Sequence, residues 1–484
     1  MELLNEIQPK EVFYYFDEIC KVPRPSKKEG KIIDYLINFA EKHSLKYDKD
    51  EAGNVVIFKP AVKGMENVKT VVLQSHVDMV AEKNGDVIHN FEKDPIQTYI
   101  DNGWIKAKGT TLGADCGIGM AASLALLAAD NVKHGAIECL FTVDEETGLT
   151  GAKALQKGFF TGKILLNLDS EDDGELFIGC AGGIDTIAKF TFATEDTPTN
   201  YKAYKISVTG LLGGHSGDDI NKERGNAIKI LNRFLWRMSY KYDFRTNTFD
   251  GGNLRNAIPR EAYAIIVIHR STVNGFVEDF ESIKKSILEE YISIEKGITI
   301  EMTKTELPDH VIDETTQFEL LATIQSCPSG VISMSKEIPN LVETSTNLAS
   351  IKFKNNSIKI TTSQRSSVES RKYDTSDTIR SLFSLTNALV HASDGYPGWK
   401  PNTNSEILNI TKEAYKKLFN GEPQVKAIHA GLECGLFLEK YPDLDMISFG
   451  PTIRDAHSPN ERLEISTVGK FWELLKEVLG NIPA

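Results

Sequence analysis

The sequence is poor in cysteine, with 6 among 484 residues and neither a CxxC pair nor a dense framework. Scattered thiols of this kind predict reduced, mostly buried cysteines rather than a disulfide scaffold. Long hydrophobic runs are missing as well. The apolar stretch at 119–129 is too short to cross a bilayer, and the N-terminus has no basic segment followed by a long apolar one. We therefore expect a soluble, cytoplasmic protein without a membrane partner.

The chain also lacks an excess of positive charge. It has 55 Lys and Arg against 68 Asp and Glu, which gives a formal net charge of −13. That sign argues against a nucleic-acid partner, because binding to the phosphate backbone needs a basic surface. Small zwitterionic substrates are not excluded. At roughly 150 residues per domain, the length predicts two to three domains.

The first part of the sequence alternates short apolar strands with helices. Strands are expected at Val55–Phe58 and Ile137–Val143, and a helix rich in Ala and Leu at Gly117–Ala129. Short apolar strands between helices predict a sheet buried on both faces, and hence an α/β fold. Around Gly182–Gly183 the pattern changes, and from about 202 to 392 it is that of an α+β structure, whose last helix is expected at 376–392.

Candidate functional residues follow the expected strands. In an open α/β sheet the carboxyl ends of the strands are where ligands bind. The side chains found there are imidazoles and carboxylates, which suit an open catalytic zinc site rather than a closed, cysteine-rich structural one. The candidate ligands are His76, Asp115, Glu146, Asp169 and His457.

Each motif taken alone has a simpler interpretation. A His-x-Asp sequence such as His76-Val-Asp78 is usually a surface turn, the acids at 144–146 resemble a solvated turn, and His457 is as readily structural. The glycine spacing at 109–119 resembles a dinucleotide-binding loop. However, Asp115 stands in its middle and no strand directly precedes it, so we reject that interpretation.

Together the five residues predict two metal ions. Each ion takes one histidine and one terminal carboxylate, and the two share a bridging aspartate. Glu145, next to a ligand, is then free to act as general base, taking a proton from a metal-bound water and giving it to the leaving amine. Zinc lowers the pKa of such a water towards roughly 7.

The motifs resemble those of the co-catalytic zinc aminoacylase and carboxypeptidase superfamily. The chain length and the flanking segments resemble its aminoacyl-histidine dipeptidase branch. The resemblance covers nearly the whole chain, in order. The motifs that carry it are Val22-Pro-Arg-Pro-Ser26, Ser75-His76-Val-Asp78, Gly113-Ala-Asp115, Asp144-Glu145-Glu146-Thr-Gly148, Asn167-Leu-Asp169-Ser, Gly213-Gly-His215-Ser-Gly217, Gly251–Pro259, His429-Ala-Gly-Leu-Glu433 and His457-Ser-Pro-Asn-Glu461-Arg.

The resemblance implies a three-layer α/β zinc-peptidase catalytic domain in two parts, at 1–185 and 393–484. An α+β lid domain at 186–392 is inserted between them. The candidate metal residues lie before 183 and after 428, which agrees with an insertion. The resemblance also implies a homodimer.

The resemblance further implies roles for the metal-site residues. His76 and Asp169 bind one Zn²⁺, Glu146 and His457 bind the other, and Asp115 bridges them, with Mn²⁺ or Co²⁺ as possible substitutes. Glu145 is the general base and Asp78 orients His76. The peptide bond after Asp115 is expected to be cis. Cys116 departs from the family pattern, in which Asp or Asn is more frequent.

Substrate contacts are implied as well. His215 stabilises the oxyanion, Asn256 and Arg365 hold the substrate carboxylate, and Glu433 recognises the free amino group. Simpler interpretations are a flexible turn for His215 and a surface position for Arg365.

The activity implied is hydrolysis of Xaa-His dipeptides, such as carnosine, by a zinc-bound hydroxide. A deacylase or tripeptidase with the same metal core is the alternative within enzymes. A binding protein descended from the enzyme is a different class, but it would usually have lost Glu145 or a ligand, and all are present.

Overall fold

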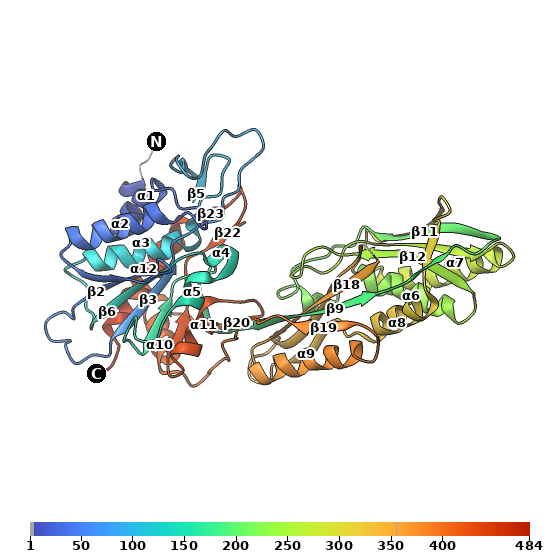
Figure 1. Cartoon of the computed structure of the whole chain (residues 1–484). Coiled ribbons are helices and arrows are strands. Elements are labelled where there is room, and N and C mark those ends of the chain that lie inside the picture. The colour runs from blue at the N-terminus through green and yellow to red at the C-terminus, as the bar shows by residue number, and fades with distance from the viewer. Residues whose placement is uncertain (1–3, 355) are drawn as a thin grey trace. The chain divides into compact units, whose positions relative to one another are not determined.

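The structure is a computed structural model that describes residues 4–354 and 356–484, and the chain divides into two compact units (Figure 1). The first unit contains the chain up to Cys180, together with Trp399–Ala427 and Leu432–Ala484. The second contains Ala181–Gly398 and Ile428–Gly431. It is therefore an insertion into the first unit, beginning at residue 181 rather than 186 and continuing to 398 rather than 392.

The first unit is built on a mixed sheet of eight strands in the order β1-β2-β6-β3-β7-β21-β8-β20. Every residue of β3, β6 and β7 is buried. Because successive side chains of a strand point to opposite faces, both faces of the sheet are covered, as the α/β prediction requires. The strands are β1 Lys46–Lys49, β2 Val55–Lys59, β3 Val71–His76, β6 Ile137–Thr142, β7 Ile164–Asn167, β8 Glu175–Cys180, β20 Gln424–Ile428 and β21 Asp445–Ser448.

A second, smaller sheet of this unit has the order β22-β23-β5-β4. The helices of the unit include the apolar α3, which begins directly after Gly113 in the left-handed conformation (φ 71°). The small-sheet strands are β4 Thr98–Asp101, β5 Trp104–Ala107, β22 Ile453–Arg454 and β23 Arg462–Glu464. The helices are α1 Lys10–Cys20, α2 Gly30–Lys42, α3 Ala114–Ala128, α4 Glu145–Gly148, α5 Thr150–Ala154, α10 Glu406–Phe419, α11 Glu433–Lys440 and α12 Ile465–Gly480.

The second unit has a nine-stranded antiparallel sheet in the order β14-β11-β13-β12-β17-β18-β9-β19, and β16 also pairs with β17. Its core combines strand and helix side chains such as Ile266, Phe234 and Phe280. The strands are β9 Gly182–Thr191, β11 Tyr201–Thr209, β12 Phe244–Gly251, β13 Ala262–His269, β14 Thr299–Lys304, β16 Gly330–Met334, β17 Val342–Lys354, β18 Ser357–Ser366 and β19 Leu389–Ala392. The helices are α6 Ala227–Ser239, α7 Val273–Tyr291, α8 Glu314–Ser326 and α9 Glu369–Phe383.

The helix expected at 376–392 is wrong at its C-terminal end. Helix α9 stops at Phe383, and Leu389–Ala392 forms the edge strand β19 beside β9. Between them the Thr386 hydroxyl donates to the Phe383 carbonyl and accepts from the backbone N–H of Ala388. Because these local side-chain hydrogen bonds compete with the helical backbone hydrogen bonds, the helix ends here.

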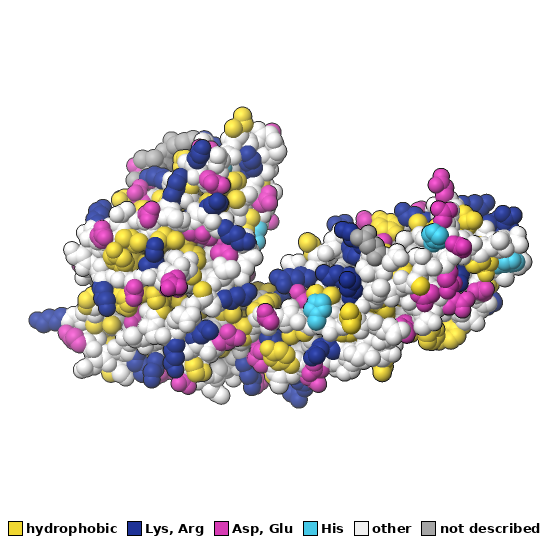
Figure 2. All heavy atoms as spheres, in the orientation of Figure 1, with side chains coloured by type: hydrophobic (Ala, Val, Ile, Leu, Met, Phe, Trp, Pro, Cys, Tyr) yellow, Lys and Arg dark blue, Asp and Glu magenta, His cyan; other side chains and the backbone are white. Residues whose placement is uncertain are grey.

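Among the described residues, no helix is both long and apolar enough to cross a membrane. On the face of the first unit drawn in Figure 2, basic and acidic side chains are interspersed rather than separated.

Candidate metal centre

Three neighbouring strands of the first unit end at the same edge of the sheet with candidate ligands. β3 is parallel to both β6 and β7. His76 is the last residue of β3, Glu146 lies in α4 directly after β6, and Asp169 follows β7 by two residues. Parallel strands have their carboxyl ends together, so the sheet itself gathers these side chains.

Asp115 lies between the two histidines of the cluster. Its Oδ1 is 3.2 Å from His76 Nε2, and its Oδ2 is 3.1 Å from His457 Nε2. Asp115 enters from the start of α3, and His457 from the loop that joins β22 to β23. One carboxylate thus faces two imidazoles with its two oxygens, which is the arrangement expected of a bridging ligand.

Each histidine also faces a second carboxylate. His76 Nε2 is 3.3 Å from Asp169 Oδ1, and His457 Nε2 is 3.0 Å from Glu146 Oε2. A ring nitrogen carries at most one proton, so it cannot satisfy two carboxylate oxygens. Asp169 Oδ1 is buried and has no hydrogen-bond partner among the described residues.

This donor set fits divalent cations. The side-chain ligand atoms of Asp115, Glu146 and His457 lie within 4.8 Å of one another, and so do those of His76, Glu145 and Glu146. The set is one of imidazole nitrogens and carboxylate oxygens, which suits zinc and several other divalent ions. The five predicted ligands are therefore brought together within one unit.

Asp78 supports the cluster from behind. Its Oδ1 is 3.3 Å from His76 Nδ1 and accepts a hydrogen bond from the backbone N–H of Glu145 at 3.0 Å. Its Oδ2 accepts from the N–H of Glu146 at 3.3 Å. A carboxylate on the far ring nitrogen fixes the orientation and tautomer of a metal-binding histidine. Asp78 therefore links the ring of His76 to the start of α4.

Glu145 lies beside the ligands without facing a histidine as closely as Glu146 does. Burial raises the pKa of its carboxyl well above the ordinary value. A buried carboxyl with a raised pKa beside a cation site is the kind of group that exchanges protons near neutral pH.

The peptide bond between Asp115 and Cys116 is cis, which confirms the prediction. The Cys116 side chain is buried, and its Sγ donates to the carbonyl oxygen of Leu168 at 3.3 Å. Its sulfur also lies within 4.8 Å of ligand atoms of His76 and Asp169.

Glu433, predicted to contact the substrate amino group, is 1% exposed in the first unit. Its Oε2 accepts hydrogen bonds from Gln74 Nε2 at 2.6 Å and Thr142 Oγ1 at 2.8 Å, and burial raises its pKa to about 8. In this conformation a substrate has no access to the carboxyl, so an amino-group contact requires a rearrangement around α11.

Sequence reasoning did not identify the two residues that hold Glu433. Gln74 and Thr142 are polar residues of the fully buried strands β3 and β6. A buried polar side chain is costly unless it has a partner, so its presence in such a strand is a signal that a buried network exists. Gln74 also accepts a hydrogen bond from Asn167 through its Oε1, which extends the network to β7.

His215, Asn256 and Arg365 belong to the second unit. Arg365 is 7% exposed and donates to Tyr396 Oη at 2.9 Å, so it is not a surface residue. His215 is partly buried, with Nδ1 3.2 Å from Asp218 Oδ2, and Arg365 Nη2 lies 3.5 Å from its Nε2. Asn256 is exposed, and its backbone carbonyl oxygen accepts from the N–H of Ser216 at 2.8 Å. These three residues therefore belong to one region of the second unit.

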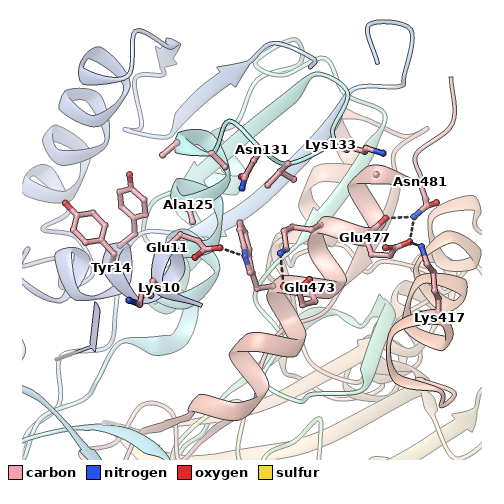
Figure 3. A pocket seen from close by; sticks show the side chains of 17 residues that line it. Lys10, Glu11, Tyr14, Ala125, Asn131, Lys133, Lys417, Glu473, Glu477 and Asn481 are labelled. Carbon is pink, nitrogen blue, oxygen red and sulfur yellow. Dashed lines mark hydrogen bonds and ion pairs between the residues drawn. The ribbon is translucent and has the colours of Figure 1, made fainter. Parts of the chain in front are cut away.

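A groove of about 970 Å³ lies elsewhere in the first unit, among α1, the end of α3 and α12 (Figure 3). Two pairs of its charged side chains form ion pairs, Lys417 with Glu477 at 2.6 Å and Lys476 with Glu473 at 2.7 Å. The described residues that line it include none of the candidate ligands. The groove therefore offers no chemistry comparable to that of the histidine and carboxylate cluster.

Comparison with known proteins places the chain in a peptidase family. The model of peptidase family M20/M25/M40 matches residues 72–481. The cytosol non-specific dipeptidase of Escherichia coli (strain K12) is 42% identical over 487 residues, covering 100% of both chains.

Solved structures show the same likeness. The crystal structure of aminoacylhistidine dipeptidase from Vibrio alginolyticus matches with a TM-score of 0.94 and 42% identity, over 100% of this chain and 98% of that one. A tripeptidase from Staphylococcus aureus matches with a TM-score of 0.57 and 17% identity, over 98% of this chain and 99% of that one, which is a likeness of fold alone.

Proposed function

The chain belongs to peptidase family M20/M25/M40, and on that premise we propose that it is a metal-dependent dipeptidase acting on Xaa-His and similar dipeptides. The observation that carries the proposal is the position of Asp115, whose two oxygens face His76 and His457. The relatives named as a non-specific dipeptidase and an aminoacylhistidine dipeptidase support the substrate class.

We assign the two cations, Zn²⁺ in the first instance, to the five clustered side chains. His76 and Asp169 would hold one, Glu146 and His457 would hold the other, and Asp115 would be shared between them. When bound, such cations polarise a carbonyl and acidify a water molecule.

The chain's own residues then manage the protons and the orientation. Glu145 takes a proton from the attacking water and delivers it to the leaving amine, since it is the carboxylate beside the ligands that is not itself a ligand. Asp78 holds the ring of His76 and the backbone of Glu145, so the base and one ligand share a single support. His215, Asn256 and Arg365 are proposed for the oxyanion and the substrate carboxylate, and Glu433 for the amino group once it is accessible.

The test is hydrolysis of a panel of tripeptides and of free and N-acylated dipeptides, including carnosine and Ala-His, by metal-stripped and zinc-reloaded protein. We expect zinc-dependent cleavage of the free Xaa-His members. Cleavage of N-acylated members only would identify a deacylase, and preference for tripeptides would identify a tripeptidase; both would contradict the dipeptidase assignment while keeping the metal centre. Parallel reloading with Mn²⁺ and Co²⁺ measures the metal preference.

A homodimer and a cytoplasmic location are further parts of the proposal. Light scattering on the eluting peak of a size-exclusion column measures the first. A mass near twice 53.8 kDa supports the dimer, and a mass near 53.8 kDa contradicts it.

A further inference from the structure

The backbone of the loop that carries Asp115 is hydrogen-bonded to a single buried carboxylate, that of Glu461. Its Oε2 accepts the backbone N–H groups of Leu112 at 2.7 Å and Gly113 at 2.9 Å, and its Oε1 accepts those of Ala114 at 2.7 Å and Asp115 at 3.4 Å. Glu461 is 2% exposed. Four consecutive amides thus share one carboxylate, and the last of them belongs to the proposed bridging residue.

The other side of the same loop is held by a buried guanidinium. Arg24, 2% exposed, donates through Nη2 to the carbonyl of Gly113 and through Nη1 to those of Val77 at 2.9 Å and Asp78 at 2.7 Å. A side chain at Gly113 would meet the guanidinium at 2.6 Å, so this position needs glycine. The Asp115 loop is therefore fixed between Glu461 and the segment that follows His76.

Glu461 also stands four residues after His457, at the end of the loop between β22 and β23. The His457 side chain is 53% exposed, so packing alone does not hold it in place. Its backbone has a φ of 62°, and the loop is pinned locally by Glu461 N–H to the Ser458 carbonyl at 3.0 Å. Because Glu461 belongs to the loop of His457, its carboxylate connects that loop directly to the loop of Asp115.

A purely structural role for Glu461 is the alternative. Its carboxylate lies at the N-terminus of α3, where an acid satisfies unpaired amides and interacts favourably with the helix dipole. Loss of such a contact lowers stability. A purely structural role would not change the affinity for one particular cation.

We propose that Glu461 is a positioning residue that sets the distance between Asp115 and His457, and so determines the affinity for the cation held by Glu146 and His457. The inference rests on the proposed metal ligands. Removing a group that orients a ligand typically weakens metal binding by about 10- to 100-fold. We expect the other cation, held by His76 and Asp169, to be affected less.

The experiment compares the variant Glu461→Gln with wild type by titrating metal-free protein with Zn²⁺ in competition with a chelator. In the isosteric amide, an NH₂ group replaces one oxygen and faces two backbone N–H donors, so two of the four hydrogen bonds to the loop are lost. We expect one of the two dissociation constants, that of the cation held by Glu146 and His457, to rise about 10- to 100-fold and the other to change less. We expect kcat to recover at high Zn²⁺ while KM is unchanged.

Glu138→Gln is the matched control. Glu138 is also buried in the first unit, and its carboxylate accepts the backbone N–H groups of Thr161 at 2.7 Å and Gly162 at 2.9 Å. Its loss should lower the melting temperature of the metal-free protein and leave both dissociation constants unchanged.

If both variants keep the two dissociation constants of the wild-type protein, the inference is overturned. If the wild-type protein itself binds fewer than two Zn²⁺, the proposed function is overturned instead. If Glu461→Gln does not fold, amide hydrogen exchange in the metal-free wild-type protein tests the hydrogen bonds to Glu461 on which the inference depends. Four backbone amides bonded to Glu461 should exchange slowly at Leu112–Asp115. Exchange as fast as in an exposed loop would contradict the inference.

Discussion

At the scale of single residues, the two adjacent acids after β6 have different surroundings. Glu146 Oε2 lies 3.0 Å from His457 Nε2, whereas both backbone amides of the pair are held by Asp78. These two hydrogen bonds hold the backbone of both residues in place. In the proposed mechanism, Glu146 serves as a ligand and Glu145 transfers the proton.

Replacement of Glu145 by alanine separates these roles. We expect Glu145→Ala to bind two Zn²⁺ and to lose about 10²- to 10⁴-fold in kcat, because general-base catalysis contributes about that much. Steady-state kinetics together with metal analysis of the same sample measures both. Turnover at the wild-type rate would remove Glu145 from the mechanism.

Glu433 predicts a pH dependence of stability in metal-free protein. Its folded pKa of about 8 lies above the ordinary value of 4.5. Between these values the folded chain holds a proton that the unfolded chain has lost, so the free energy of unfolding falls as pH rises through this window.

Glu433→Gln should remove that component. Relative to wild type, the variant is expected to become more stable as the pH rises from about 5 to about 8. Urea unfolding of both proteins at several pH values measures the difference. A difference that is constant with pH would contradict the raised pKa.

The sequence indicated the ligands but not the surroundings of Glu433. His76, Glu146 and Asp169 follow apolar strands, and that order along the chain is visible without a structure. The burial of Glu433 depends on Gln74 and Thr142, which are 359 and 291 residues away in sequence. Such long-range contacts leave no periodic pattern in one sequence.

At the scale of elements, helix α3 approaches the end of β7 so closely that only glycine fits at one position. A Cβ on Gly119 would lie 2.5 Å from the carbonyl oxygen of Leu168 and 2.8 Å from Cys116 Sγ. Leu168 immediately precedes Asp169, so the contact connects α3 to a proposed ligand.

Gly119→Ala is therefore expected to destabilise the protein by about 1–3 kcal/mol, because the backbone of Leu168 has to move. Gly469→Ala is the matched control. Gly469 lies in α12 with no atom within 4 Å of its ideal Cβ, so alanine should stabilise the helix by up to about 1 kcal/mol. Urea denaturation of metal-free protein measures both, and equal effects of the two substitutions would contradict the account.

The element predictions held where the apolar pattern was uninterrupted. The strand expected at Ile137–Val143 is β6, and the one at Val55–Phe58 is β2. The segment 376–392 failed because local hydrogen bonds of Thr386 and pairing with β9 outweigh helical spacing.

At the scale of the whole molecule, the five proposed ligands and the proposed base lie in one unit, and His215 and Arg365 in the other. The insertion was predictable because the ligand motifs lie on both sides of it in sequence. Its bounds were predicted less closely: β9 begins at Gly182, where the sequence pattern changes, although the lid was expected from 186.

His215→Ala tests whether the second unit takes part in the reaction. We expect kcat to fall by about 10²- to 10³-fold, the size typical of losing one oxyanion donor, with zinc content unchanged. Kinetics and metal analysis on the same preparation provide the values. An unchanged kcat would show that His215 has no part in catalysis.

The most direct test of the dinuclear centre is an anomalous difference map from a crystal of zinc-loaded protein, collected at the zinc absorption edge. The account predicts two peaks roughly 3.5–4 Å apart, one beside His76 and Asp169, the other beside Glu146 and His457, with Asp115 between them. A single peak, or peaks away from these five side chains, would contradict it.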